Sequence, residues 1–180
     1  MKLEFSDEKT LITHSQKAAK FLGYAVLANR SNLAKRDNRL SRVYNKKVLL
    51  RISMETIKKK LLDFGVLEVK THNGKEHWKP REHRKIICND NLEILQKYNY
   101  TIRGFHNYYA IANNSSLLNS YKYIMEYSMY KTFAGKYKSK VSKIARKYKQ
   151  DGLFTVQYQG SKGGEKQQTF YNESFSRRKT

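Results

Sequence analysis

The spacing of apolar residues divides the chain into a strand-like first part and a helical second part. Alternation predicts a strand over Lys2–Phe5, and apolar or β-branched runs predict strands over Lys9–His14 and Phe21–Val26. Another short strand is expected over Lys46–Ile52. Residues 28–45 are rich in Arg, Lys, Asn and Ser and poor in aliphatic side chains, so we expect a basic loop there.

A short helix is expected to start after Ser53, a good capping residue, and to stop at Gly65. Its apolar face would consist of Ile57, Leu61, Leu62 and Phe64. The stretch from Thr71 to Arg84 has the composition of a loop, with a turn at Asn73-Gly74.

Three amphipathic helices are predicted next. Apolar residues recur every three or four positions between Leu95 and Ala112, after cap candidates at 89–91. The polar run 113–116 ends this helix and would cap the next, over 117–137, and a third helix should span 139–149. Three such helices can enclose a bundle core.

Two strands around a glycine-rich turn, Leu153–Tyr158 and Gln168–Tyr171, should follow the helices. The fold class is therefore α+β: small β elements, a three-helix bundle and a short C-terminal β-hairpin. We expect four segments, which are residues 1–28, a basic connecting region 29–88, the bundle 89–152, and a hairpin with a basic tail 153–180.

Charge narrows the function. The chain of 180 residues has 37 Lys and Arg against 15 Asp and Glu, a formal net charge of +22, which favours a polyanionic partner. The 14 Tyr and 8 Phe argue against a disordered basic tail. One cysteine, no apolar run near the roughly 20 residues of a membrane span, and no secretory leader predict an intracellular nucleic-acid-binding protein without a membrane partner.

Catalytic and metal-binding chemistry find little support in the sequence. The acidic residues are scattered, so no carboxylate pair for two-metal catalysis is visible, and there is no phosphate-binding loop. His72, His77, His83 and Cys88 lie close together in sequence, but their spacing matches no compact zinc site. His106 lies within a predicted helix without neighbouring acids. We therefore predict no catalytic residues, no metal and no cofactor in this chain.

Two basic tracts are the strongest candidates for RNA or DNA contact. One extends from Arg30 to Arg51 and the other, which contains no acidic residue, from Lys131 to Lys149. Most tyrosines lie between Tyr98 and Tyr148, where some would form the core and others could stack on bases. The sequence does not separate the two groups.

Several motifs resemble those of one protein family. Tyr98-Asn99, Ile102-Arg103-Gly104 and Asn107-Tyr108-Tyr109 are similar to the signature helix of the group II intron maturase domain, also called domain X. Residues 127–138 resemble the second block of that domain, and residues 8–12 and 21–24 resemble the last palm strands of intron-encoded reverse transcriptases. Pro80 and Arg84 stand where the family has its pre-helix segment.

The resemblance implies the palm end and the maturase domain, which is the thumb, of a group II intron-encoded reverse transcriptase. Such proteins bind their intron RNA, assist its splicing and reverse-transcribe it. The fingers and the paired palm aspartates would lie upstream of residue 1, so this chain would be an excised piece or a split or decayed reading frame. Whether it takes part in enzymatic RNA-directed DNA polymerisation stays open.

The resemblance and the charge pattern together give the candidate site residues. The expected partners are structured intron RNA, an RNA/DNA template–primer duplex and an upstream palm and fingers polypeptide, in a bacterial cytoplasm or an organelle. The primer-grip-like residues would be Phe21, Leu22, Gly23 and Tyr24, and the motif-helix residues are Tyr98, Asn99, Arg103, Gly104, Asn107, Tyr108 and Tyr109. The RNA-binding candidates are Arg30, Arg36, Arg39, Lys131, Lys136, Lys138, Lys140, Lys143, Arg146 and Lys147.

Three hypotheses remain open. The first is an RNA-binding splicing factor, the second a polymerase fragment that is inactive without its palm, and the third a general basic DNA-binding module. For Arg103, a pairing role within the fold and an RNA contact are equally good interpretations.

Overall fold

The structure is a computed structural model that describes residues 14–29, 47–160 and 163–176. Its first sheet is antiparallel, with the order β1 (Ala19–Phe21), β2 (Tyr24–Asn29) and β3 (Lys47–Arg51). The strand expected over Lys46–Ile52 is confirmed. The strands expected before residue 14, and Arg30, Arg36 and Arg39 of the basic loop, lie outside the described residues.

The single strand expected over Phe21–Val26 is wrong, because the chain reverses direction within it. Leu22 and Gly23 both have positive φ, 48° and 76°, and form the two-residue turn between β1 and β2. Positive φ at both central residues is the geometry of a type I′ turn, whose twist suits a hairpin. An apolar Leu at the first turn position makes the turn look like part of a strand in the sequence.

Helix α1 (Met54–Phe64) begins and ends where the sequence predicts. The Ser53 hydroxyl accepts a hydrogen bond from the Thr56 amide at 3.1 Å, and Gly65 closes the helix with a left-handed φ of 79°. Ile57 and Leu61 are buried, but Leu62 is 45% exposed. The apolar face is therefore narrower than expected.

The stretch Thr71–Arg84, which was expected to be a loop, contains the end of one strand and the whole of the next, and these form a β-hairpin. Strands β4 (Leu67–His72) and β5 (Lys75–Pro80) pair around the predicted Asn73-Gly74 turn, where both residues have positive φ. Leu67 is buried and the cross-strand pair Val69 and Trp78 packs against the core, whereas more than half of the side chains of the two strands are exposed. Within Thr71–Arg84 the one large apolar residue is Trp78, so no alternating pattern is visible there and the loop interpretation was wrong.

The three predicted bundle helices are α2 (Asn91–Tyr109), α3 (Leu118–Lys136) and α4 (Val141–Tyr148). Together with α1, the described residues contain four α-helices, and short 3₁₀ turns at Arg84–Ile86 and Ser115–Leu117 precede α2 and α3. Asp90 caps α2 by accepting a hydrogen bond from the Leu92 amide at 3.0 Å.

Asn113 and Asn114 do not cap α3, which has no side-chain cap bond. The Asn113 side-chain oxygen instead accepts from the Leu50 amide at 2.9 Å. The Asn114 side chain accepts from the Ile52 amide at 2.8 Å and donates to its carbonyl at 2.9 Å. The turn between α2 and α3 thereby satisfies the backbone of the β3 edge and attaches the first sheet to the bundle.

The C-terminal strands are β6 (Lys149–Gln150), β7 (Leu153–Gln159) and β8 (Glu165–Thr169), in that order in an antiparallel sheet. The predicted hairpin is confirmed, but its second strand begins three residues before the expected Gln168 and ends before Phe170. After β8 the chain follows α2, and Asn99 bonds both the Thr169 carbonyl and the Tyr171 amide at 2.8 Å. Phe170, Tyr171 and Phe175 are buried there.

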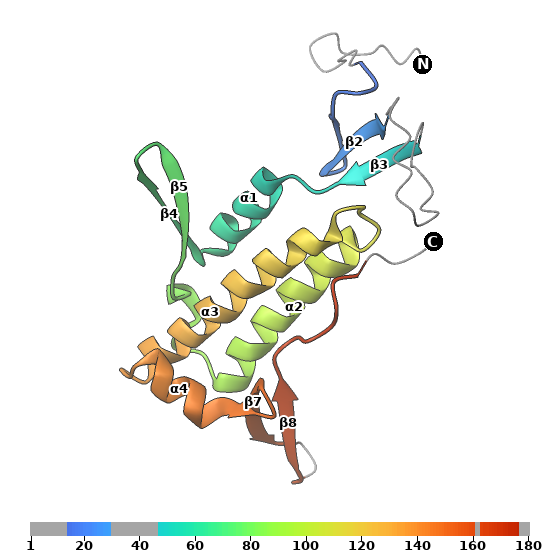
Figure 1. Cartoon of the computed structure of the whole chain (residues 1–180). Coiled ribbons are helices and arrows are strands. Elements are labelled where there is room, and N and C mark those ends of the chain that lie inside the picture. The colour runs from blue at the N-terminus through green and yellow to red at the C-terminus, as the bar shows by residue number, and fades with distance from the viewer. Residues whose placement is uncertain (1–13, 30–46, 161–162, 177–180) are drawn as a thin grey trace, which may run out of the picture.

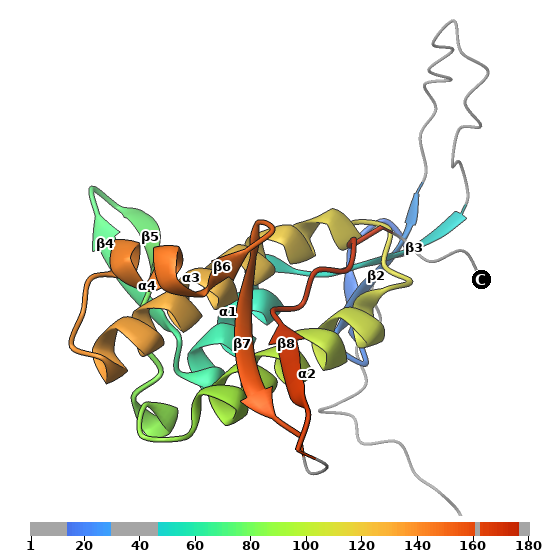
Figure 2. The ribbon, with the colours of Figure 1, turned by 90° about the horizontal axis from the view of Figure 1, so that it is seen from below.

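The sheets lie around the helices. Figure 1 shows α3 beside α2, the first sheet near the turn that joins them, and β7 and β8 at the opposite end of the helices. Figure 2 shows that β7 and β8 lie against α2, and that α4 lies beside α3. One cluster of buried side chains extends from Tyr24 to Phe175. The α+β class is confirmed, and the division into four segments stays a prediction.

Candidate nucleic-acid interface

Helix α4 and the turn before it present a continuous basic surface, which we call the basic face. Ile144 and Tyr148 are buried, and Val141 and Ala145 pack against the core, as the predicted apolar arc requires. The basic face consists of the exposed cations that remain: Lys138, Lys140, Lys143, Arg146 and Lys147. Among the described residues none of these five forms an ion pair, so their charges are available to an anionic ligand.

Two tyrosines contact Lys147 of the basic face. The Tyr137 and Tyr148 rings stack with their centroids 6.3 Å apart, and Lys147 lies 5.4 Å from the first centroid and 5.3 Å from the second. Tyr137 donates a hydrogen bond to the Asn91 side-chain oxygen at 2.8 Å. Burial acts in the opposite direction, but the hydrogen bonds of Tyr137 and the two neighbouring lysine charges lower its pKa. The hydrogen bonds to Tyr148 and Asn91 lower this pKa most, and the positive charges of Lys136 and Lys147 add to the lowering.

Two other RNA-binding candidates also make contacts within the fold. The Lys131 ammonium donates to the Pro80 carbonyl at 2.7 Å, and the Lys136 ammonium donates to the Asn89 carbonyl. Both side chains are half-buried. A neutral carbonyl does not cancel the charge, so each lysine still adds to the local positive potential, although its position is fixed.

The structure brings the primer-grip-like residues and the motif helix together. Tyr24 is buried, and its ring stacks on Tyr108 at 5.7 Å and meets the edge of Tyr109 at 5.0 Å. The Tyr108 hydroxyl donates to the Leu22 carbonyl at 2.6 Å, and the Tyr109 hydroxyl donates to the Gly23 carbonyl at 3.3 Å. The end of α2 thus holds the hairpin turn, while Phe21 and Leu22 stay 64% and 68% exposed.

A groove lies between this hairpin turn, α1 and α2, and we call it the hairpin groove. It has a volume of about 590 Å³, and its lining includes Leu22, Gly23, Lys59, Lys60, Tyr100 and Tyr108. Lys59, Lys60 and Tyr100 were not among the predicted site residues. The available signal was the lysine run on the outward side of α1; among the described residues Lys58 pairs with Glu76 at 2.6 Å, and Lys59 and Lys60 form no ion pair.

The motif-helix residues divide between the interior and the surface. Tyr98 and Asn99 are buried and hydrogen-bonded within the fold. Gly104 lines the hairpin groove, and Asn107 is exposed. Arg103 is exposed, with its guanidinium carbon 5.9 Å from the centre of the Tyr171 ring. This cation–π contact places Arg103 against the C-terminal segment, and the side chain stays accessible to solvent.

The histidines do not converge on a metal site. His83 is buried against Phe64, whereas His72 and His77 face each other across the β4–β5 hairpin and Cys88 is exposed. Within the described ranges, no group of three or more His, Cys, Asp or Glu side chains could hold a metal ion. His106 is buried and packs on the rings of Tyr171 and Phe175. In the part of the chain that the structure describes, no helix is both long and apolar enough to span a bilayer.

Comparison with known proteins identifies the class. A family model described as Type II intron maturase matches residues 45–180 of the chain. This chain therefore belongs to the Type II intron maturase family, which confirms the resemblance found in its motifs.

The particular relatives are group II intron-encoded proteins. Over 177 residues the chain is 37% identical to the group II intron-encoded protein LtrA of Lactococcus lactis subsp. cremoris, and it matches the LtrA of strain MG1363 to the same degree. Each match covers 97% of this chain but 29% of the relative. The chain thus spans less than a third of the length of these proteins.

Proposed function

We propose that this chain is the RNA-binding part of a group II intron maturase, which binds structured intron RNA and assists its splicing. The observation that supports this proposal most strongly is the basic face, where five exposed cations have no carboxylate partner among the described residues. Structured RNA presents phosphates and 2′-hydroxyls, which a surface of this kind recognises by shape and charge.

The test measures binding to a group II intron RNA and to an unrelated folded RNA of the same length. If about 6–10 phosphates are neutralised, affinity should fall roughly 10³–10⁵-fold between 50 and 200 mM salt. Replacing Lys140, Lys143 and Arg146 by Ala should reduce the salt slope by about one for each lost phosphate contact, whereas the matched change Lys166→Ala on β8 should not. Equal affinity for both RNAs would contradict a specific maturase role.

A second function, as the thumb of a reverse transcriptase, has separate support. The hairpin groove joins primer-grip-like residues to the motif helix and is flanked by Lys59 and Lys60. A template–primer duplex in this groove would have its backbone neutralised by those lysines. Adding the chain in trans to a fingers and palm polypeptide should then stimulate cDNA synthesis, and the absence of stimulation would count against it.

The third hypothesis, a general basic DNA-binding module, predicts a different result in the same assays. A basic surface that does not recognise base sequence binds the phosphate backbone, which duplex DNA also presents. Equal affinity for duplex DNA and for intron RNA would favour this hypothesis over the first. As a maturase, the chain would act in a bacterial cytoplasm or in an organelle, where its cognate intron is transcribed.

A further inference from the structure

Two exposed tyrosines form a stacked pair on the outside of α3. Tyr123 and Tyr127 lie one helical turn apart and are 64% and 40% exposed. Their rings are almost parallel, with an interplanar angle of 23° and a centroid distance of 6.3 Å. Most other tyrosines of the helices, such as Tyr98, Tyr121 and Tyr130, are buried in the core. The pair therefore leaves flat aromatic surface open to solvent.

Lys131 extends this pair by one more turn, and we call the three residues Tyr123, Tyr127 and Lys131 the tyrosine row. The Lys131 ammonium lies 5.5 Å from the Tyr127 ring centre and is held by its bond to the Pro80 carbonyl. Because both contacts restrain the side chain, the cation is already positioned when a ligand arrives.

The row leads into a cation-lined pocket. The pocket lies between the end of α3 and the 3₁₀ turn at Arg84–Ile86, and its lining includes Arg84, Lys131, Gly135 and Lys138. Its one acidic residue, Glu82, is paired with Arg84 at 3.0 Å. Lys138 has no ion pair among the described residues and also belongs to the basic face. From Tyr123 to Gly135 the helix rises about 18 Å, the length of about five stacked nucleotides.

Aromatic surfaces next to a cationic groove are the combination that binds single-stranded nucleic acid, because every base has a π-face and every linkage has a phosphate. The net charge of +22 favours an anionic ligand over a second copy of this chain. The hairpin groove and this pocket share no lining residue, so the two surfaces are distinct.

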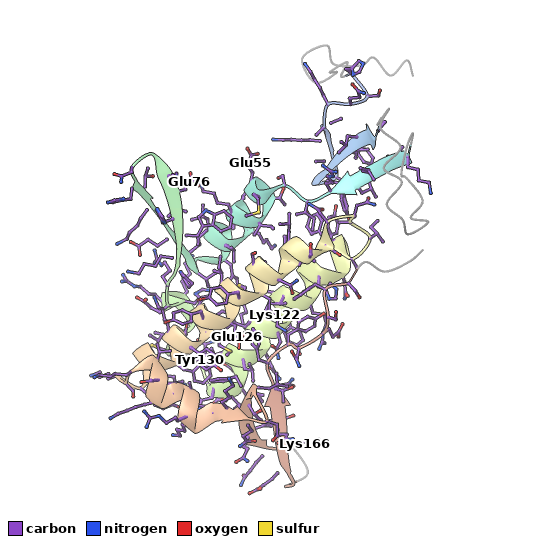
Figure 3. The ribbon with its side chains drawn as sticks, viewed as in Figure 1. Glu55, Glu76, Lys122, Glu126, Tyr130 and Lys166 are labelled. Carbon is purple, nitrogen blue, oxygen red and sulfur yellow. The ribbon has the colours of Figure 1, made fainter. Side chains whose placement is uncertain are left out.

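We propose that an unpaired RNA segment binds along α3, with its bases stacked on Tyr123 and Tyr127 and a phosphate in the pocket of Arg84, Lys131 and Lys138. This inference rests on the proposed RNA-binding function and adds a site for unpaired nucleotides to it. In Figure 3, Lys122, Glu126 and Tyr130 mark the course of α3, and Lys166 marks the separate β8 strand.

The test uses the full chain and a fluorescently labelled single-stranded octaadenylate RNA, followed by anisotropy. The double variant Tyr123→Leu/Tyr127→Leu keeps apolar area but loses both π-faces, so affinity should fall at least about tenfold. The double variant Tyr123→Phe/Tyr127→Phe keeps the rings and should bind within about twofold of the wild type. Lys138→Ala should weaken binding about threefold or more, whereas the matched Lys166→Ala should not.

Further controls separate base stacking from charge alone. An abasic octanucleotide has the same phosphates and should bind the wild type and the leucine double variant equally. Equal binding of octaadenylate to both proteins, or no binding to the wild type, would overturn the inference. Structured intron RNA and the unrelated folded RNA, measured in parallel, test the proposed function itself. If the intron RNA still binds more tightly than the unrelated RNA, with a steep salt dependence, the proposed function stands while the α3 site falls.

Discussion

Two buried tyrosines in the bundle core should respond in opposite directions to the loss of a hydroxyl. The Tyr98 hydroxyl lies 2.8 Å from the Ser128 hydroxyl and 3.0 Å from that of Thr132. The Tyr121 hydroxyl is buried and has no hydrogen-bond partner among the described residues. Phe replaces either residue with almost the same shape, so the comparison isolates the hydroxyl.

The direction of the hydrogen bonds around Tyr98 follows from its neighbours. Ser128 donates its proton to the Arg81 carbonyl at 2.6 Å, and Thr132 donates its proton to the Ser128 carbonyl at 2.9 Å. Both side-chain protons are therefore in use, and Tyr98 must donate its single proton, shared between the two hydroxyl oxygens. Tyr98→Phe removes that donor and leaves the two hydroxyls with one acceptor position unfilled.

The expected changes follow from these contacts. Tyr98→Phe should lower the free energy of unfolding by about 1 kcal/mol, the usual net value of an intramolecular hydrogen bond. Tyr121→Phe removes a buried polar group without a partner, whose desolvation costs about 1–3 kcal/mol, so it should leave stability unchanged or raise it by about 1 kcal/mol.

Urea denaturation of the wild type and both variants, monitored by circular dichroism, measures the change in the free energy of unfolding. The midpoints can be compared directly when the slope of this free energy against urea concentration is the same in all three proteins. The order of the two midpoints is decisive: Tyr121→Phe should unfold at a higher urea concentration than the wild type or at the same one, and Tyr98→Phe at a lower one. A loss of 1 kcal/mol or more for Tyr121→Phe would refute the reasoning, because it would require a hydrogen bond at that hydroxyl.

Alkaline pH provides an independent readout of the same two groups. Burial raises the pKa of Tyr98 to about 12, and burial also raises the pKa of Tyr121 above its ordinary value. A phenol whose pKa is higher in the folded state gives full stability below its unfolded pKa near 10, and this stability is lost as the pH rises. Each Phe variant should therefore show a shallower loss of stability above pH 10 than the wild type.

Three further predictions test the hairpin, the sheet attachment and a buried histidine. Gly23→Ala should lower the free energy of unfolding by about 1–2 kcal/mol, which is more than Gly65→Ala should. Both glycines have positive φ, but of the two only Gly23 would place a Cβ against another residue, 2.7 Å from the Tyr109 hydroxyl. Similar losses for the two variants in urea denaturation would contradict this. Asn114→Ala should cost about 1–3 kcal/mol and speed hydrogen exchange at the Ile52 amide, and an unchanged exchange rate would contradict the attachment. Burial, with nearby lysine and arginine charges, lowers the pKa of His83. The neutral imidazole therefore stabilises the folded state above about pH 6.5, and this stability is lost as the pH falls. An NMR titration midpoint of His83 at or above about 6.5 would count against this.

The sequence predicted those parts of the fold in which one face of an element is buried. The periodic apolar residues of α2, α3 and α4 and the caps at Ser53 and Asp90 located the helices to within three residues. The β4–β5 hairpin was missed because Trp78 is the one large apolar residue between Thr71 and Lys79, so this stretch shows no alternation. The Leu22–Gly23 turn was missed because leucine rarely occupies a turn position with positive φ.

The candidate site was predictable in charge but not in geometry. The run of cations in α4 is visible in the sequence, and the apolar arc of the helix shows which of its residues face outward. Which tyrosines are exposed depends on contacts between distant segments. Tyr121 and Tyr123 are two positions apart on the same helix, yet the first is fully buried and the second is 64% exposed. Tyrosines occur on both the buried and the exposed sides of α3, so the residue type alone could not separate them.

Helix α2 fixes the distance between the basic face and the hairpin groove. At its first residue, Asn91 bonds the hydroxyl groups of Tyr137 and Tyr148 beneath the basic face. At its other end, Tyr108 and Tyr109 hold the hairpin turn that borders the groove. The helix between them rises about 27 Å, and a single packed helix does not change its length when a ligand binds. We therefore expect a change at a buried motif residue to affect both surfaces, and a change at an exposed cation to affect only its own. Loss of Asn99, which ties the C-terminal segment to the middle of α2, should weaken binding at both surfaces together, while loss of Lys143 should weaken binding at the basic face alone.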